Sequence, residues 1–187
     1  MPFAFEKLAI PDVVLVTPHI FEDARGFFIK FYHRGEYAKN GIACTFVEDS
    51  HSRSQYGVLR GLHFQKGAAS EAKLVRCIRG SVYDVAVDLR KGSSTFGKHV
   101  AVVLSEQNKK LLFIPRGFAH GFLVTSKEGA EMQYKMDAPY APDADAGLAW
   151  NDPRVSVQWP IKAPTLSEKD KKLPELAELK DEELPKP

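Results

Sequence analysis

Two neighbouring stretches, 58–65 and 73–90, place ionisable side chains among residues typical of buried strands. The alternation of a β-strand puts Lys73 on the same face as Val75, and it turns His63 toward the same interior. An imidazole and an ammonium in a half-buried cavity lose water around their charged forms, and such groups are common where protons are transferred. The sequence therefore indicates a proton-transfer site, although an isolated strand histidine is more often structural.

Three further polar side chains stand inside an expected strand or at its entrance. Asp84 interrupts the run VYDVAVD, and an ion pair between Lys73 and Asp84 is the simplest structural explanation for both residues. His120 follows a turn in FIPRGFAHGF, a position that more often caps backbone than reacts. Tyr134 in MQYKM is either a core tyrosine or a general acid that returns a proton to carbon.

Metal and nucleophile chemistry find little support in the residue spacing. The six histidines include no HxH pair, and Gln65 stands where a second ligand would be needed, so we predict no metal. No serine lies in a nucleophile-elbow sequence, and no glycine loop precedes a helix as in phosphate-binding folds. Cys44 and Cys77 lack CxxC spacing and are interpreted as reduced apolar residues.

Anion binding has better candidates among the side chains. Cations stand at expected strand ends or loop edges, as a diphosphate would require, and nearby aromatic rings are able to stack on a base or sugar. The cations are Arg25, Arg60, Lys73, Arg116 and Lys169, and the aromatics are Phe27, Phe28 and Tyr140. Taken singly, each is more often a solvated charge or a core aromatic.

Length and composition favour one globular domain. A chain of 187 residues buries roughly 70% of its extended surface. The charged fraction of 27% and the net charge of +2 build no basic stripe, so no nucleic acid partner is expected. No apolar run approaches a membrane span and the N-terminus lacks a signal-peptide pattern, so we predict a cytoplasmic protein without a membrane partner. The domain is expected to cover 1–187, with 175–187 as a tail that docks as a short helix or frays.

Short β-rich runs recur with turn residues between them, which favours a sandwich or barrel. The runs are 13–17, 26–32, 44–49, 58–65, 73–80, 81–89, 98–104, 111–115, 121–125 and 130–136. The turn at 80–81 and the connection 66–72 each predict a hairpin between the strands they join. Helical pieces are expected near 36–40, 105–110 and 168–172, with Ser167 capping the last, and 137–152 is expected as a surface loop.

Longer motifs resemble one known family. They are DARGFF, FVEDSHS, VLRGLHFQ, KLVRCIRG, VYDVAVDLR, STFG, FIPRGFAHGF, YKMDAPYAP, WND and LSEKD. In this order they are similar to the dTDP-4-dehydrorhamnose 3,5-epimerases of the cupin superfamily, across residues 3 to 174. The resemblance implies an all-β, cupin-type jelly-roll barrel with few short helices, a homodimer, and no metal or other cofactor. It implies an isomerase of dTDP-rhamnose biosynthesis that inverts C3 and C5 of a thymidine diphosphate-linked 4-keto-6-deoxyhexose.

The resemblance also assigns roles to individual residues. His63 corresponds to the catalytic base, Asp170 to its carboxylate partner, Tyr134 to the general acid, and Lys73 to the cation near the developing enolate. The residues expected to contact the substrate are Arg25, Phe28, Lys30, Glu48, Ser50, Arg60, His120, Tyr140, Asp145 and Lys169. Strand parity puts Arg60 and His63 on opposite faces, so Gly61 must permit a bulge or Arg60 must serve elsewhere, as in a neighbouring subunit.

Three substrate-side positions depart from the family pattern. Lys30 stands where the family usually has glutamate, and Glu48 and Ser50 replace the glutamine and asparagine of many members. A different base or sugar substituent is therefore an alternative. Further alternatives are an epimerase that inverts C3 alone, a non-catalytic carbohydrate-binding cupin, and a metal-dependent cupin oxygenase or isomerase.

Overall fold

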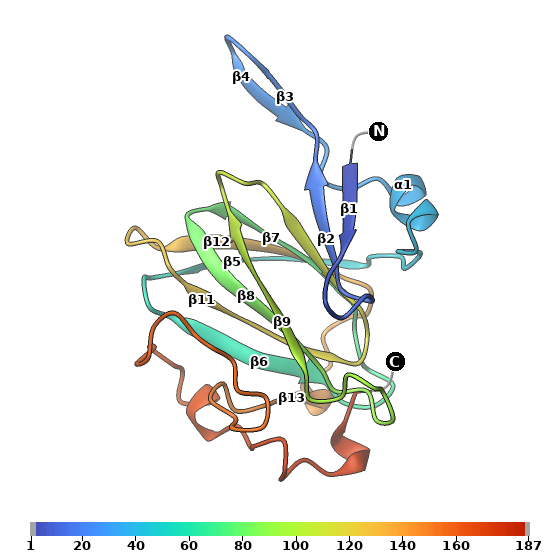
Figure 1. Cartoon of the computed structure of the whole chain (residues 1–187), viewed down its shortest axis with the longest axis vertical. Coiled ribbons are helices and arrows are strands. Elements are labelled where there is room, and N and C mark those ends of the chain that lie inside the picture. The colour runs from blue at the N-terminus through green and yellow to red at the C-terminus, as the bar shows by residue number, and fades with distance from the viewer. Residues whose placement is uncertain (1–2, 186–187) are drawn as a thin grey trace.

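The computed structural model describes residues 3–185 as two antiparallel sheets that face each other, with a hairpin standing apart (Figure 1). The larger sheet contains, in spatial order, β1 (Phe3–Lys7), β2 (Val14–Pro18), β10 (Leu111–Ile114), β7 (Lys73–Arg79), β12 (Ala130–Met136) and β5 (Glu48–Ser54). The smaller contains β13 (Asp145–Gly147), β6 (Leu59–Gln65), β11 (Phe118–Val124), β8 (Ser81–Asp88) and β9 (His99–Ser105). This arrangement confirms the predicted jelly roll.

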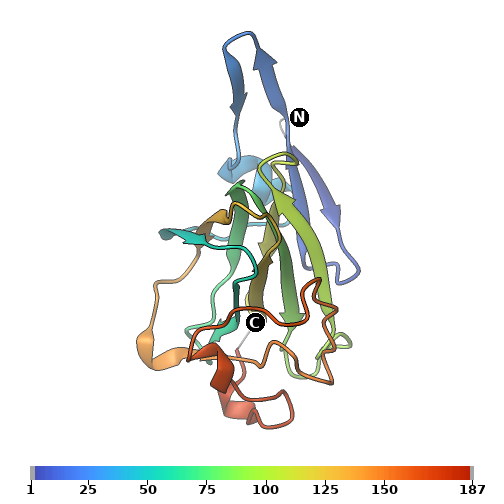
Figure 2. The same cartoon turned by 90° about the vertical axis from the view of Figure 1, so that its left-hand side faces the viewer.

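The hairpin pairs β3 (Ile20–Asp23) with β4 (Gly26–Ile29) and projects from one end of the barrel in both views (Figures 1 and 2). Within residues 3–185, helical structure consists of α1 (Arg34–Lys39) and three 3-10 turns, η1 (Pro142–Ala144), η2 (Asp170–Lys172) and η3 (Asp181–Glu183). No helix in residues 3–185 has the length and apolarity needed to cross a membrane.

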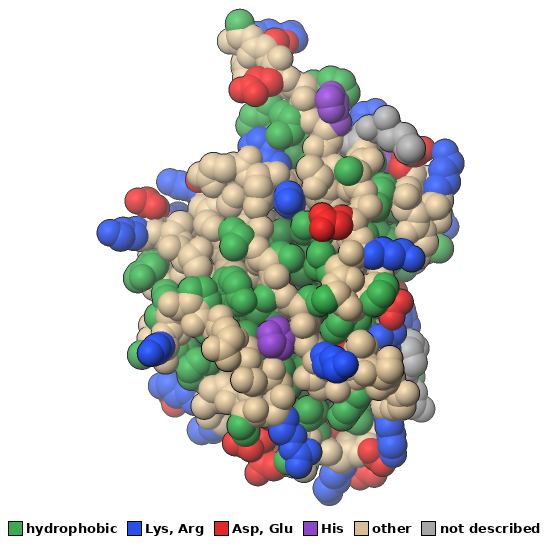
Figure 3. Space-filling view, in the orientation of Figure 1, with side chains coloured by type: hydrophobic (Ala, Val, Ile, Leu, Met, Phe, Trp, Pro, Cys, Tyr) green, Lys and Arg blue, Asp and Glu red, His purple; other side chains and the backbone are tan. Residues whose placement is uncertain are grey.

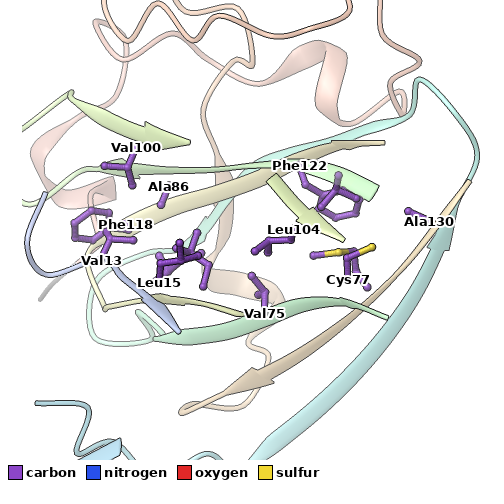
Figure 4. Packing of buried hydrophobic residues seen from close by; sticks show 14 of the residues in the cluster. Val13, Leu15, Val75, Cys77, Ala86, Val100, Leu104, Phe118, Phe122 and Ala130 are labelled. Atoms are coloured by element: carbon purple, nitrogen blue, oxygen red, sulfur yellow. The ribbon is translucent and has the colours of Figure 1, made fainter. Parts of the chain in front are cut away.

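The hydrophobic core fills the space between the two sheets. Val75 and Cys77 of β7 meet Ala86 of β8 and Phe122 of β11 in one buried layer (Figure 4). Lys73 has the same strand parity as Val75 and Cys77, so the predicted inward orientation of the lysine is confirmed. The polar site is therefore an extension of the core toward one end of the barrel.

Both predicted hairpins beside β7 are wrong. Strand β6 lies in the smaller sheet and β7 in the larger one, and the chain returns to the smaller sheet at β8. The turn glycine is still required, since Gly80 has φ +77° and a Cβ there would approach the carbonyl oxygen of Gly129 to 2.2 Å. Crossing between sheets places His63 and Lys73 on different sheets.

The boundaries of two strands differ from the prediction. Strand β5 runs over Glu48–Ser54 instead of 44–49, and its sequence EDSHSRS has no apolar face. Ser50 and Ser52 alternate with the exposed residues His51 and Arg53, because one face of β5 borders the polar end of the barrel interior. Strand β11 begins at Phe118 instead of 121, so His120 lies within a strand and not at its entrance.

Residues 105–110, expected to be helical, form a turn instead. The Ser105 backbone N–H donates to Asn108 Oδ1, and the Asn108 N–H donates to Ser105 Oγ. This reciprocal pair satisfies the local backbone without a helix. Strands β1, β3 and β13 were not predicted, and β13 lies with η1 inside the expected loop 137–152.

The C-terminal tail packs against the outer face of the smaller sheet (Figure 2). Leu176 and Leu184 are 8% and 7% exposed and join Leu62 and Phe64 of β6 in a second apolar cluster. Each such burial contributes about 1.5–3 kcal/mol, which favours docking of a segment with little regular structure. The tail is therefore docked, chiefly in turns instead of the expected helix, although residues 186–187 lie outside the described part of the chain.

Candidate active site

A bulge in β6 brings Arg60 and His63 to the same face. His63 pairs with His120 of β11, whereas Arg60 pairs with Phe122, so three steps along β6 match two along β11. Gly61 permits this, since its φ is +116° and a Cβ there would lie 2.6 Å from the Cα of Gly121. The bulge considered from the sequence is confirmed, and it removes the parity conflict.

His63 and Asp170 form a hydrogen-bonded pair. His63 Nε2 lies 2.6 Å from Asp170 Oδ1, and the carboxylate is 4% exposed. The Asp170 N–H donates to Ser167 Oγ at 3.0 Å, so the predicted capping by Ser167 is confirmed. Burial alone would raise the pKa of Asp170, but the hydrogen bond and charge of His63, helped by Ser167, lower it below its usual value.

Tyr134 projects into the same interior from the opposite sheet. Its hydroxyl lies 2.8 Å from Ser52 Oγ, and its ring lies edge-on to that of His120 with centroids 6.4 Å apart. Burial raises the pKa of Tyr134, so the phenol keeps its proton at neutral pH. His120 Nε2 contacts Asp84 Oδ1 at 2.9 Å deep in the barrel, where both side chains are buried.

Lys73 lines a cleft of about 410 Å³ at this end of the barrel. Its lining residues are Glu48, Ser50, Glu71, Lys73, Tyr134, Met136 and Tyr140. The alternative pairing of Lys73 with Asp84 is wrong, because Asp84 accepts from His120 while Lys73 Nζ lies 3.0 Å from Glu71 Oε1. His63 is not among these lining residues. It pairs in register with His120 of β11, and the His120 ring contacts Tyr134, which lines the cleft.

The mouth of the site joins two loops through polar side chains. Tyr140 donates its hydroxyl to Asp145 Oδ2 at 2.9 Å, and its backbone N–H donates to Glu48 Oε2 at 3.1 Å. Lys169 forms an ion pair with the same Asp145 carboxylate. Burial opposes ionisation of Asp145, but the hydrogen bonds from Lys169 and Tyr140 lower its pKa overall.

Arg60 borders the barrel interior on the other side of Tyr134, at the end of β5 distant from Glu48. Its Nε donates to Ser54 Oγ at 2.8 Å, on the serine face of β5. Ser50 is the register partner of Tyr134. Four predicted substrate contacts, Glu48, Ser50, Arg60 and His120, thus lie around the predicted acid.

Three predicted substrate contacts lie apart from the others. Arg25 sits at the turn of the β3–β4 hairpin, paired with Asp23 at 2.6 Å, and Phe28 is 60% exposed on β4. Lys30 follows β4 directly. Figure 3 shows this hairpin standing clear of the body of the protein. Within one chain, the structure does not bring these three residues to the site.

Sequence reasoning missed Glu71 and Ser52, which contact Lys73 and Tyr134. The sequence did offer a signal for Ser52. Serines alternate through 50–54, and a strand with one buried face usually carries apolar residues at such positions. Glu71 lies two residues before Lys73 in a connection that offered no periodicity to interpret. Within residues 3–185, no group of three His, Cys, Asp or Glu side chains converges as a metal site requires.

A jelly-roll barrel is typical of an acid–base enzyme acting on a polar substrate when one sheet carries a histidine paired with a carboxylate and the other carries a protonated phenol and an ammonium. The family model described as dTDP-4-dehydrorhamnose 3,5-epimerase matches residues 7–178. The chain belongs to the dTDP-4-dehydrorhamnose 3,5-epimerase family, and the predictions of that family and of an epimerase are confirmed.

Relatives support this membership along most of the chain. A dTDP-4-dehydrorhamnose 3,5-epimerase of Pseudomonas aeruginosa is 51% identical, with 88% of this chain and 91% of that protein covered. The solved structure of the Legionella pneumophila epimerase in complex with dTDP-4-keto-L-rhamnose is 40% identical, with a TM-score of 0.95 and coverage of 99% and 98%. A 3'-monoepimerase from Streptomyces bikiniensis, solved with dTDP-quinovose, is 27% identical, with a TM-score of 0.84 and coverage of 91% and 86%.

Proposed function

We propose that this chain converts dTDP-4-dehydro-6-deoxy-glucose into dTDP-4-dehydrorhamnose by inverting C3 and C5. The observation that carries the proposal is the placement of His63, which pairs with Asp170, and of Tyr134 on opposite sheets of one barrel interior. Inversion of a carbon atom needs proton removal on one face and proton return on the other, so two groups must approach the ring from opposite sides.

His63 is the proposed base. The C4 ketone acidifies the protons on C3 and C5, so a neutral imidazole is strong enough to remove one of them. Because Nε2 faces Asp170 at 2.6 Å, Nδ1 is the nitrogen left to accept the proton. Asp170 fixes that tautomer and stabilises the imidazolium that forms.

Tyr134 and Lys73 are the proposed acid and enolate stabiliser. Burial keeps the phenol of Tyr134 protonated, because it raises the pKa, so the hydroxyl has a proton to return to carbon. Lys73 lines the same cleft and supplies positive charge for the oxygen of the enolate. No cofactor is needed in this scheme, since the ketone itself activates both positions.

The remaining predicted residues are proposed to bind the nucleotide and diphosphate. Lys169 supplies positive charge at the mouth, with Tyr140 and Asp145 beside it, and Arg60 supplies positive charge on the other side of Tyr134. The Glu48 carboxylate contacts the same loop, because it accepts a hydrogen bond from the Tyr140 backbone N–H. The glutamate that replaces the family's usual residue therefore lies where the base or sugar is proposed to bind. A dTDP substrate is proposed on the strength of the family.

A homodimer is proposed to complete the site with the projecting hairpin. Arg25, Phe28 and Lys30 contact substrate only if a second copy presents them, because their own hairpin points away from the barrel mouth (Figure 2). The hairpin exposes Ile20, Phe21, Phe27 and Phe28, an apolar surface of the kind that mediates association.

Proton exchange in deuterated water tests the reaction. The wild type is expected to incorporate deuterium at both C3 and C5 of the dTDP substrate, detected by NMR. His63→Ala is expected to lose exchange by ~10²–10⁴-fold, since it lacks the base. Tyr134→Phe is expected to keep exchange of the proton that His63 removes, while product formation falls by a similar factor.

Exchange confined to C3 would replace the proposal with inversion at C3 alone. Absence of exchange, with ligand affinity retained in His63→Ala, would favour a carbohydrate-binding protein. A parallel run with the UDP-linked sugar tests the choice of base at Lys30, Glu48 and Ser50.

A further inference from the structure

Glu71 lies at the centre of a polar connection between the two sides of the site. It precedes β7 by two residues, and its side chain is 11% exposed at the wall of the cleft that Tyr134 and Lys73 also line. One carboxylate oxygen, Oε1, lies 3.0 Å from Lys73 Nζ. The other, Oε2, accepts from Gln65 Nε2 at 3.2 Å. Glu71 thus uses both oxygens, each toward a different partner.

Gln65 carries the connection to the loop that holds Tyr140. This last residue of β6 is 3% exposed, so its amide must find partners inside the protein. Nε2 contacts the carbonyls of Ala69 at 3.1 Å and Pro139 at 3.2 Å, and Oε1 accepts from the Ala141 N–H. The contacts with Pro139 and Ala141 flank Tyr140 on either side. A side chain held in this way fixes the loop and not merely one residue of it.

The geometry assigns Glu71 as a positioning residue that fixes Lys73 on the sugar side and, through Gln65, the Tyr140 loop on the nucleotide side. A structural ion pair alone would need one carboxylate oxygen and would have no reason to engage the glutamine. The inference rests on the proposed function, since it takes Lys73 as the enolate stabiliser and Tyr140 as a nucleotide contact. It adds that the two halves of the site are set by one carboxylate.

Two substitutions separate the two connections of Glu71. Glu71→Gln keeps a side-chain oxygen for the Gln65 amide but removes the charge that holds Lys73. We expect kcat to fall about tenfold, the size of losing one hydrogen bond to a charged group, with the Kd for dTDP unchanged within about twofold. Glu71→Ala removes the contacts with both Lys73 and Gln65, so we expect the same fall in kcat together with about tenfold weaker dTDP binding.

Glu131→Gln is the matched control. Glu131 is a half-buried glutamate of β12 that pairs with His51 and Arg79 outside the site, so its substitution is expected to leave kcat and the Kd for dTDP unchanged. Calorimetric titration with dTDP gives the Kd, and steady-state kinetics give kcat and KM.

Equal effects of Glu71→Gln and Glu71→Ala on dTDP binding would overturn the inference, as would an unchanged kcat in Glu71→Gln. Its failure is distinguishable from failure of the proposed function. If the wild type exchanges no substrate protons, the reaction is wrong, whereas the dTDP titrations still report whether Glu71 sets the loop.

Discussion

Asp170 couples the chemistry of a single side chain to the stability of the fold. Its pKa is lowered in the folded protein, mainly by the hydrogen bond and charge of His63 that outweigh burial. A lowered folded pKa contributes stability that is present above the unfolded value of about 4 and is lost as the pH falls through the folded pKa. The stabilisation by Asp170 is therefore present at neutral pH and disappears in acid.

Asp170→Asn tests this at two levels. We expect the free energy of unfolding, measured with urea at pH 7, to fall by about 1–3 kcal/mol, and the difference from wild type to narrow below a pH of about 4. We expect kcat to fall by ~10²–10⁴-fold, because the His63 tautomer is no longer fixed by a charge. The control Asp49→Asn breaks an exposed ion pair with Lys135 and should lower the free energy of unfolding by about 0–1 kcal/mol. A difference that stays constant with pH would contradict the argument.

At the level of strands and loops, the sequence predicted which residues face the interior but not which strands are neighbours. Alternation identified the inward lysine because a strand in either sheet has the same period of two. It assigned wrong partners to β6, β7 and β8, because a short connection crosses between facing sheets as readily as it closes a hairpin. Strand β5 was misplaced because apolar runs were the signal, and this strand borders a polar cavity.

The docked tail follows η2, the turn that brings Asp170 to His63. Leu176 lies six residues beyond Asp170 and is buried against the smaller sheet. We expect Leu176→Ala to lower the free energy of unfolding by about 2–5 kcal/mol. We also expect it to lower kcat of the folded enzyme, because the segment that holds Asp170 is less tightly packed against the sheet. Leu104→Ala, in the core between the sheets, is expected to cost similar stability with kcat of the folded enzyme unchanged. Equal kcat in the two variants, measured well below their melting temperatures, would reject the role of the tail.

On the scale of the whole molecule, the proposed homodimer depends on the exposed hairpin. Phe28→Asp places a charge on the exposed apolar surface of the hairpin, so we expect the mass measured by light scattering to change from dimer to monomer and KM to rise at least about tenfold. Phe96→Asp, at an exposed aromatic outside the hairpin, is the control and should remain dimeric. A monomeric wild type with full activity would contradict the shared site.

The position of Asp170 in the chain also has a consequence for protein synthesis. His63 and its carboxylate partner are 107 residues apart, and the carboxylate is synthesised after every strand of the barrel. A nascent chain therefore contains the histidine, the lysine and the tyrosine before it contains the group that orients the imidazole. If the proposed mechanism holds, products terminated before Asp170 are inactive even when their barrel strands are all present.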